Sequence, residues 1–227
     1  MPNAGNGSLA AALPVRPGGN PLTVTVSNSV AVVGQLVTPA LTDQTLTASI
    51  LVGQSQTPNS VATGGVAFHS LGTGSTTVSA TIPGVIQTTA GSRILTVTVP
   101  IITVGTSTTG SGLVRQAGAT LGATAHGGVT VTIKNSSPGL LLVSNSASTV
   151  GDDSTTVFVP NNTTNVIFWI HGVEGQTGTA TVTVSAPGST DGTALMTVVQ
   201  PALDIQNLFA TTTASSPDTP FTVRIGV

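Results

Sequence analysis

The sequence predicts an all-β protein made of two tandem antiparallel β-sandwich domains and a C-terminal strand segment. Short runs of residues alternate Val, Ile or Leu with Thr or Ser, which is the pattern of half-buried strands. Turn residues recur between these runs at the spacing typical of sandwiches. Several motifs also occur twice in the same order. The 227 residues are enough for two domains of about 100 residues each.

The alternating runs are the individual strands. In 22–26 and 129–133, Thr separates Val, Ile or Leu, so the apolar side chains can face a core and the β-branched Thr side chains can face water. The first domain is expected to hold strands near 22–26, 31–37, 45–52, 61–68, 75–82 and 94–99. The second is expected to hold strands near 101–104, 113–116, 129–133, 140–143, 154–159, 165–170, 178–184 and 194–199.

Internal repetition sets the domain boundaries. Three segments of the first domain recur in order in the second: 22–29 as 129–136, 73–84 as 177–188, and 94–100 as 195–201. The repetition predicts a first sandwich over 1–100 that lacks its opening strand and a complete sandwich over 101–201. Residues 202–227 read as the opening strand segment of a next repeat.

The end of this last segment is a candidate assembly strand. Phe221, Val223 and Ile225 lie on one face at the period of a β-strand, with no expected partner in their own repeat. Segment 202–227 therefore holds what the first domain lacks. It could complete that domain in the same chain, in a neighbouring chain or in a longer parent protein. A boundary placed arbitrarily within a long array of tandem repeats would also leave an incomplete first domain and an opening segment at the C-terminus.

One repeated stretch is similar to a known family. The Thr-Gly-Ser/Thr-x-Thr-Val strand that leads into Pro-Gly, in 73–84 and again in 177–188, resembles bacterial immunoglobulin-like repeats of large secreted and cell-surface proteins. The resemblance implies immunoglobulin-like sandwiches that act as spacers, stalks or adhesive modules outside the cell. Cysteine is absent, so the core is expected to be held by packing without disulfides. The cysteine pair of antibody domains is missing.

Charge and hydropathy argue against two classes of partner. The chain has 5 basic and 7 acidic residues, and the basic ones are scattered singly, so a nucleic-acid surface is not expected. The sequence contains no apolar run near the roughly 20 residues that a spanning helix needs.

The sequence gives no sign of an enzyme or of a cofactor. His69, His126 and His171 are far apart in the sequence and are expected to have structural or surface roles. Asp152 and Asp153 form an adjacent acidic pair, but without further close carboxylates Ca²⁺ is only weakly supported. No Gly-x-Ser-x-Gly motif lies in the strand-turn-helix context of a hydrolase.

Two functions follow from these patterns. The first is a non-enzymatic structural module of an extracellular filament, stalk or adhesin, assembled head-to-tail by strand addition with itself or with adjacent repeats. The alternative is a cell-surface module that recognises glycan or protein through loops at a sandwich end, for example 145–156 or 171–177.

Overall fold

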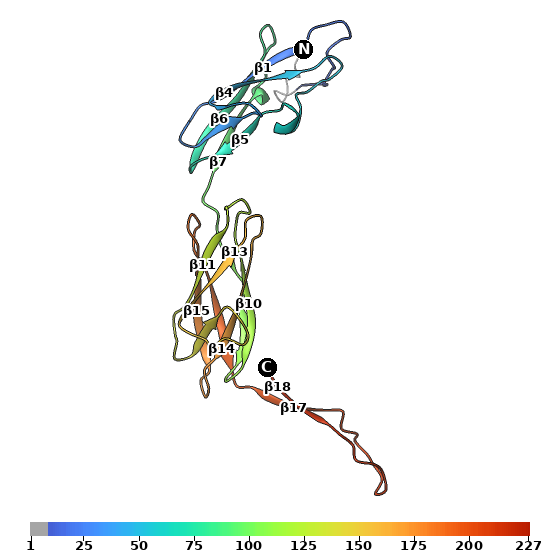
Figure 1. Cartoon of the computed structure of the whole chain (residues 1–227), viewed down its shortest axis with the longest axis vertical. Helices are drawn as coiled ribbons and strands as arrows, with labels where there is room; N and C mark the ends of the chain where they lie inside the picture. The colour runs from blue at the N-terminus through green and yellow to red at the C-terminus, as the bar shows by residue number, and fades with distance from the viewer. Residues whose placement is uncertain (1–8) are drawn as a thin grey trace. The chain divides into compact units, whose positions relative to one another are not determined.

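The computed structural model describes residues 9–227, which are almost entirely strands and turns (Figure 1). The chain divides into two compact units, Met1–Thr98 and Val99–Val227, which we call unit 1 and unit 2. Helical structure within the described residues is limited to the short 3₁₀ turns Val61–Thr63 and Thr89–Gly91. The all-β prediction is confirmed, and no helix in the described part could cross a membrane.

Unit 2 is a two-sheet sandwich. One sheet has the order β12-β14-β10-β8 and the other β13-β11-β15-β16-β9. Neighbours pair antiparallel except β9, which pairs parallel with β16. The strands are β8 (Thr103–Val104), β9 (Ser107–Gly110), β10 (Val114–Thr120), β11 (Val129–Asn135), β12 (Leu141–Ser144), β13 (Ser154–Val159), β14 (Asn165–Gly172), β15 (Gly178–Ser185) and β16 (Gly192–Val199).

The core of unit 2 follows from the alternation in its strands. In β11, Val131 and Ile133 are fully buried while Thr130 and Thr132 are exposed. In β14, Val166, Phe168 and Ile170 are likewise fully buried. Each such side chain contributes about 1.5–3 kcal/mol of burial free energy, so packing alone can hold this sandwich without disulfides.

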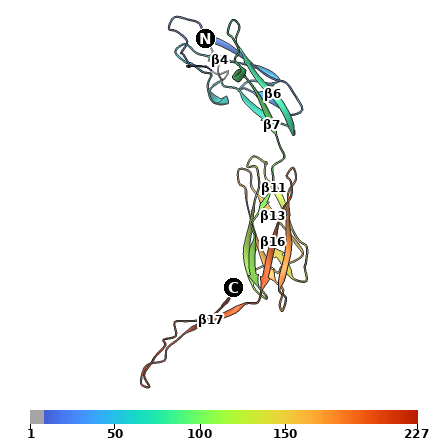
Figure 2. The same ribbon diagram turned by 180° about the vertical axis from the view of Figure 1, so that it is seen from behind.

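Unit 1 has two smaller sheets, of order β4-β1-β6-β7 and β3-β2-β5. Its strands are β1 (Leu22–Asn28), β2 (Gly34–Val37), β3 (Thr42–Asp43), β4 (Thr45–Ile50), β5 (Ala67–Ser70), β6 (Gly74–Thr81) and β7 (Ser92–Val97). Figure 2 shows β4, β6 and β7 of this unit from behind.

The two units share strand order and register. Gly74 of β6 lies opposite Val97 of β7, as Gly178 of β15 lies opposite Val198 of β16. The pairings of the other strands agree in the same way. In the larger sheet, the strands that correspond to β11, β13, β15 and β16 of unit 2 are β1, β4, β6 and β7 of unit 1. In the other sheet, β2 corresponds to β12 and β5 to β14. No described residue of unit 1 forms a counterpart of β8, β9 or β10.

A buried asparagine at the end of the first shared strand is common to both units. The side-chain N–H of Asn28 donates to the carbonyl of Gly34 at 2.7 Å, and that of Asn135 donates to the carbonyl of Leu141. The following serine accepts a backbone N–H across the sheet, from Thr77 in unit 1 and from Thr181 in unit 2. These bonds explain why an Asn-Ser pair recurs at this position.

Two expectations about strands are wrong. The strand expected over 61–68 begins only at Ala67, because Val61–Thr63 form a 3₁₀ turn closed by Gly64 at φ +94°. Gly64 is in the left-handed region, which favours glycine and is not the extended conformation of a strand. The sequence analysis also missed β9, whose Ser-Thr-Thr-Gly sequence carries no apolar alternation.

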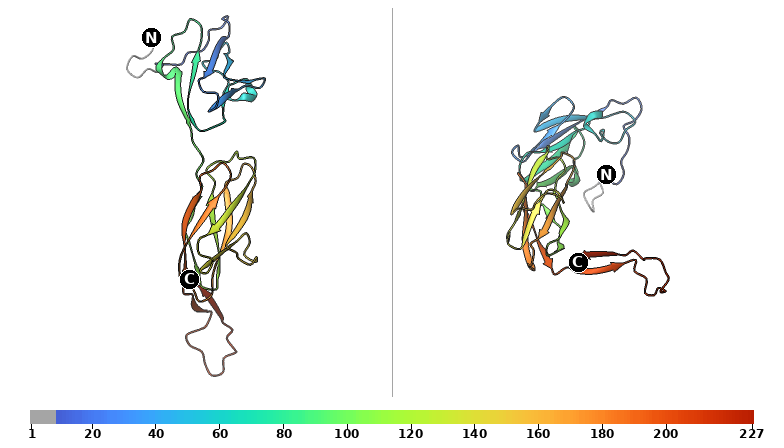
Figure 3. Two further views of the ribbon diagram at one scale, coloured as in Figure 1. Left: turned by 90° about the vertical axis from the view of Figure 1, so that its left-hand side faces the viewer. Right: turned by 60° about the horizontal axis from the view of Figure 1, so that its bottom comes forward.

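The C-terminal segment was expected to be the opening strand segment of a next repeat, with no partner for its last strand in the same segment. It forms a hairpin of β17 (Ala202–Gln206) and β18 (Thr222–Gly226), which pair antiparallel as a separate two-stranded sheet. The irregular connection between the two strands is drawn in dark red in Figure 3. β18 thus has a partner in its own segment.

Candidate assembly surfaces

The C-terminal hairpin has one apolar face and one polar face. Leu203 lies opposite Ile225 and Ile205 opposite Val223, and residues opposite one another in an antiparallel pair share a face. Phe221 has the same parity as Val223 and Ile225, which places the three predicted residues together on this face. They are 51%, 54% and 56% exposed, so about half of each residue's surface is open to solvent.

The opposite face of the hairpin is polar. Asp204 lies opposite Arg224, and the guanidinium nitrogen approaches the carboxylate oxygen to 2.8 Å. Both side chains are more than half exposed, so this pair contributes only about 0–1 kcal/mol. The hairpin therefore has one apolar and one polar face, as two neighbouring strands of a sandwich have, but no second sheet packs on its apolar face within the described residues.

The sequence analysis missed two of the five residues of this apolar face. Leu203 and Ile205 contribute to it from β17, and both are more than half exposed. The alternation Leu203-Asp204-Ile205 was a readable signal, because it repeats the spacing of Val223-Arg224-Ile225. Phe209, 73% exposed in the connection, was also missed.

Unit 1 has an uncovered core face. Leu95 of β7 is 38% exposed, whereas its counterpart Met196 in β16 is completely buried. Ala80 of β6 is exposed, whereas its counterpart Val184 in β15 is completely buried. The core-facing side chains of corresponding strands are thus buried in unit 2 and exposed to solvent in unit 1.

An apolar groove lies on this open face. It has a volume of about 370 Å³, and its lining includes Leu9, Val24, Ile50, Ala80, Ile82 and Ile86. Val24 and Ile50 correspond to Val131 and Val159, which belong to the sealed core of unit 2. The groove is therefore the exposed half of a sandwich core.

Two strand edges beside this face are unpaired within the described residues. β5 is at the end of the sheet β3-β2-β5, and β7 is at the end of the sheet β4-β1-β6-β7. In unit 2 the corresponding edges carry β10, which pairs with β14, and β9, which pairs with β16. Unit 1 thus offers backbone hydrogen-bonding groups at the two positions where unit 2 is completed.

His171 has a structural environment rather than a catalytic one. Its Nε2 lies 2.8 Å from the hydroxyl oxygen of Ser144, and that hydroxyl donates to the carbonyl of Ser146 at 2.6 Å. The hydroxyl proton is therefore already engaged, and the ring donates to Ser144 instead of accepting from it. Burial lowers the pKa of His171, which favours this neutral ring.

The other residues considered for chemistry lie apart. His126 accepts the N–H of Gly128 and bonds the carbonyl of Thr163 at 2.9 Å, so it ties a loop, and His69 is an exposed residue of β5. Asp152 accepts the N–H of Asp153 at 2.7 Å. Across residues 9–227, no three His, Cys, Asp or Glu side chains are grouped as metal ligands would be.

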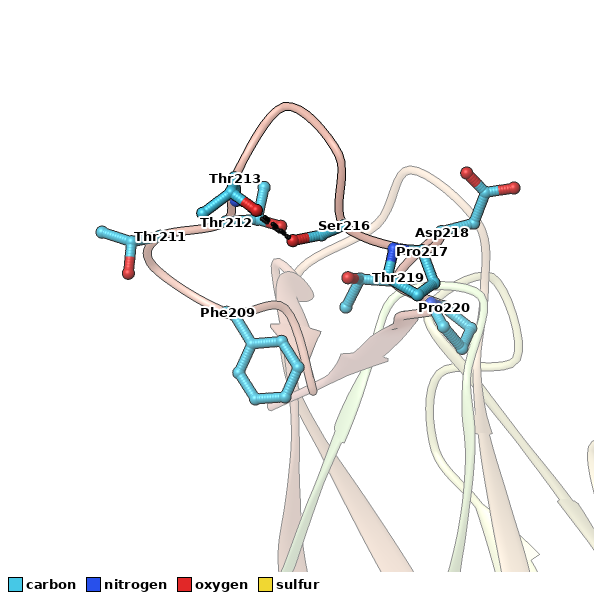
Figure 4. Close-up of a pocket in the computed structure, with 9 residues that line it drawn as sticks. All are labelled: Phe209, Thr211, Thr212, Thr213, Ser216, Pro217, Asp218, Thr219 and Pro220. Atoms are coloured by element: carbon cyan, nitrogen blue, oxygen red, sulfur yellow. Dashed lines mark hydrogen bonds between the residues drawn. The ribbon is translucent and has the colours of Figure 1, made fainter.

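A second hollow lies within the hairpin connection. It has a volume of about 550 Å³ and is enclosed by residues between Phe209 and Pro220, with Thr213 and Ser216 joined by a hydroxyl contact of 2.7 Å (Figure 4). Nearly all of the residues around it are exposed. It is a bend in an extended chain, with no buried polar group aimed into it.

Comparisons with known proteins give no family. No family model and no curated protein matches the chain. Among solved structures, domains 4 and 5 of the S-layer protein SbsC match at 16% identity and a TM-score of 0.30, over 78% of this chain and 76% of that one.

Two further solved structures match at a similar level. The adhesin InvE of Yersinia pseudotuberculosis matches at 13% identity and a TM-score of 0.34, over 81% of this chain and 50% of that one. A β-glycosidase from Bacteroides vulgatus matches at 11% and 0.31, over 82% of this chain and 24% of that one. The chain spans half of the adhesin structure and about a quarter of the glycosidase. Similarities this low leave the function to be argued from the chain's own surfaces.

Proposed function

We propose that this chain is a non-enzymatic structural module of an extracellular filament, stalk or adhesin, and that it assembles head-to-tail. The C-terminal hairpin of one copy covers the open core face of unit 1 in a second copy, in the place that β8 and β10 have in unit 2. The observation that carries the proposal is the pair of complementary apolar faces, one on the hairpin and one on unit 1.

The pairing in unit 2 supplies the geometry. There, β8 and β10 are antiparallel neighbours, and β10 pairs with β14 along its whole length. β17 and β18 are antiparallel neighbours in the same chain order, and β5 is the counterpart of β14. If the hairpin lies on unit 1 as β8 and β10 lie in unit 2, Ile205 and Val223 take the places of Val104 and Ala119, which face the core of unit 2, so the apolar face of the hairpin lies toward the groove.

The position of the hairpin in the chain favours a second copy over the same chain. Ile101 bridges Thr190 near the start of β16, and the chain leaves unit 2 at the other end of this 8-residue strand, about 25 Å away. Residues 200–201 then lead directly into β17 and can span only about 7 Å. The hairpin is therefore held at the end of unit 2 remote from Ile101.

The energetics are sufficient for a stable contact. Five apolar side chains on the hairpin face, each more than half exposed, become buried together with those that line the groove. Full burial of an exposed side chain contributes about 1.5–3 kcal/mol, so each of these contributes roughly half of that or more. These gains offset the roughly 4–15 kcal/mol that association costs in lost freedom of motion.

The test compares the intact chain with a chain that lacks 202–227 and with two point variants. Ile225→Asp places a charge on the apolar face, whereas Arg224→Asp changes the neighbouring residue on the polar face. We expect filaments or concentration-dependent oligomers of the intact chain in electron micrographs and in sedimentation. Deletion and Ile225→Asp should leave monomers, because a carboxylate on a closing core costs several kcal/mol.

Arg224→Asp is the matched control and should still assemble. Assembly that survives the deletion would refute the proposal. A compact monomer of the intact chain would also refute it and would indicate closure within one chain.

A further inference from the structure

We propose that residues 211–214 form a parallel strand on the free edge of β7 in the accepting copy. The hairpin would then contribute three strands rather than two, with its connection taking the place that β9 has in unit 2. This inference rests on the head-to-tail assembly proposed above and adds the second edge of the acceptor to it.

The sequence of the connection matches that of β9. Ala-Thr-Thr-Thr-Ala-Ser at 210–215 has the same small and hydroxyl residues as Thr-Ser-Thr-Thr-Gly-Ser at 106–111. Each stretch lies between the first and second strands of its set, β17 and β18 in one case and β8 and β10 in the other. The connection 207–221 is longer than 105–113, so its length allows a strand of this size.

The register follows from unit 2. Met196 lies opposite Ser107 and Val198 opposite Thr109 in the parallel pair of β16 and β9. Because Leu95 and Val97 are the counterparts of Met196 and Val198, Thr211 would lie opposite Leu95 and Thr213 opposite Val97.

The backbone N–H groups that would donate to β7 can be assigned as well. The N–H of Ser111 donates to the carbonyl of Val199 at 2.9 Å, just beyond the end of β9. Successive N–H groups of a strand point to opposite sides, so the N–H of Thr109 also points to β16 and that of Thr108 points away. By the same alternation, the N–H of Thr213 would point to β7 and that of Thr212 away from it.

The free connection gives little protection to these groups. Residues 211–214 are exposed, and their local bonds are those between Thr213 and Ser216. In unit 2, by contrast, Thr109 is 1% exposed and its hydroxyl donates to the carbonyl of Leu113 at 3.0 Å. Docking would therefore replace the few local bonds of the connection by backbone hydrogen bonds to the free edge of β7.

One difference limits the strand to these four residues. A Cβ at Gly172 would come within 2.3 Å of the carbonyl oxygen of Gly110, so β9 and β14 meet there without side chains. The corresponding positions in unit 1 and the tail are Ser70 and Ala214, which both have a Cβ. The carbonyl of Ala214 would meet the Cβ of Ser70 in that geometry, so the connection leaves the edge at Ala214, and Pro217 lies in the stretch that follows.

The experiment uses two proline variants of the full chain, Thr213→Pro and its matched control Thr212→Pro. Proline removes a backbone N–H and fixes φ at both positions, but only the Thr213 N–H would bond β7. We expect Thr213→Pro to raise the concentration at which half of the chain sediments as oligomer by about tenfold or more, and Thr212→Pro by much less. Amide hydrogen exchange should slow upon assembly at Thr211 and Thr213, and at those amides of 92–97 that face away from β6.

The outcomes separate the two proposals. If deletion of 202–227 abolishes assembly while both proline variants assemble alike and 211–214 stay unprotected, the parallel strand is refuted and the hairpin contact stands. If the deletion has no effect, the assembly itself is refuted. A Thr213→Pro variant that fails to assemble is checked by circular dichroism. If it has not folded, exchange at 92–97 in the assembled intact chain decides instead: slowed exchange supports the parallel strand, and unchanged exchange refutes it.

Discussion

Leu95 and Met196 occupy the same place in the same pair of strands, yet Leu95 is 38% exposed and Met196 is completely buried. Their strands, β7 and β16, pair with β6 and β15 in identical register. The difference in burial therefore comes from the layer that packs on the core face of this sheet. In unit 2 that layer contains β8 and β10, and in unit 1 the described residues leave it open.

The first prediction concerns two adjacent residues of β7. Leu95→Asp should abolish assembly, because it places a charge on the face that the hairpin covers. Ile94→Asp should assemble normally, since Ile94 is on the outer face and its counterpart Leu195 stays 56% exposed in the complete sandwich. Sedimentation of both variants checks this. Equal behaviour of the two would contradict the assignment of the face.

A second prediction concerns a rearranged chain. Residues 201–227 moved from the C-terminus to a position directly before Leu9 would place the hairpin in the order that β8 and β10 have in unit 2. Both units should then be complete within one chain, giving a monomer with no free hairpin. The melting temperature of unit 1 should rise by several degrees or more, as about 2 kcal/mol shifts a domain of this size by roughly 10 °C. Calorimetry measures the shift, and a chain that still forms oligomers would contradict it.

A third prediction concerns the buried asparagine of unit 2. Asn135→Ala removes the bond to the carbonyl of Leu141 and leaves that carbonyl unpaired in a buried site, at a cost of about 2–3 kcal/mol. Trp169 is the only tryptophan and lies in β14, so its fluorescence in urea reports the unfolding of unit 2. The exposed Asn145→Ala is the control and should change the free energy of unfolding by less than about 0.5 kcal/mol.

A fourth prediction concerns pH. Burial lowers the pKa of His171 in the folded state, so the unfolded chain binds more protons between the two pKa values. The contribution of the neutral ring is present above the unfolded pKa of about 6.5 and is lost as the pH falls through the lowered folded value. The urea midpoint of unit 2 should therefore fall on acidification below about pH 6.5. His171→Gln should flatten that part of the profile, and an unchanged slope would contradict the assignment.

Most of the fold could be predicted from the sequence because Thr alternation marks a half-buried strand. Segments 22–26 and 129–133 were found as strands for this reason. β9 was missed because both of its faces are lined with small hydroxyl residues and glycine, so it has no apolar period. The 3₁₀ turn at Val61–Thr63 was missed because Val and Thr favour strands, whereas Gly64 ends the run.

The candidate surfaces were predicted only in part. Phe221, Val223 and Ile225 were found by their period, but pairing between β17 and β18 depends on residues distant in sequence and could not be read from either strand alone. The open face of unit 1 was inferred from a missing strand. Which residues it exposes, such as Ala80, became visible only through the register of β6 with β7.

The short connection after β16 has a mechanical consequence. Within the chain, residues 98–102 join β7 to β8, and residues 200–201 join β16 to β17 in the same way. In an assembled fibre, each hairpin would thus be tied to the sandwich before it by a covalent link of two residues. A pulling force would then pass from one copy to the next through hydrogen-bonded strands. The contact between copies would resist that force as paired strands of one sheet do.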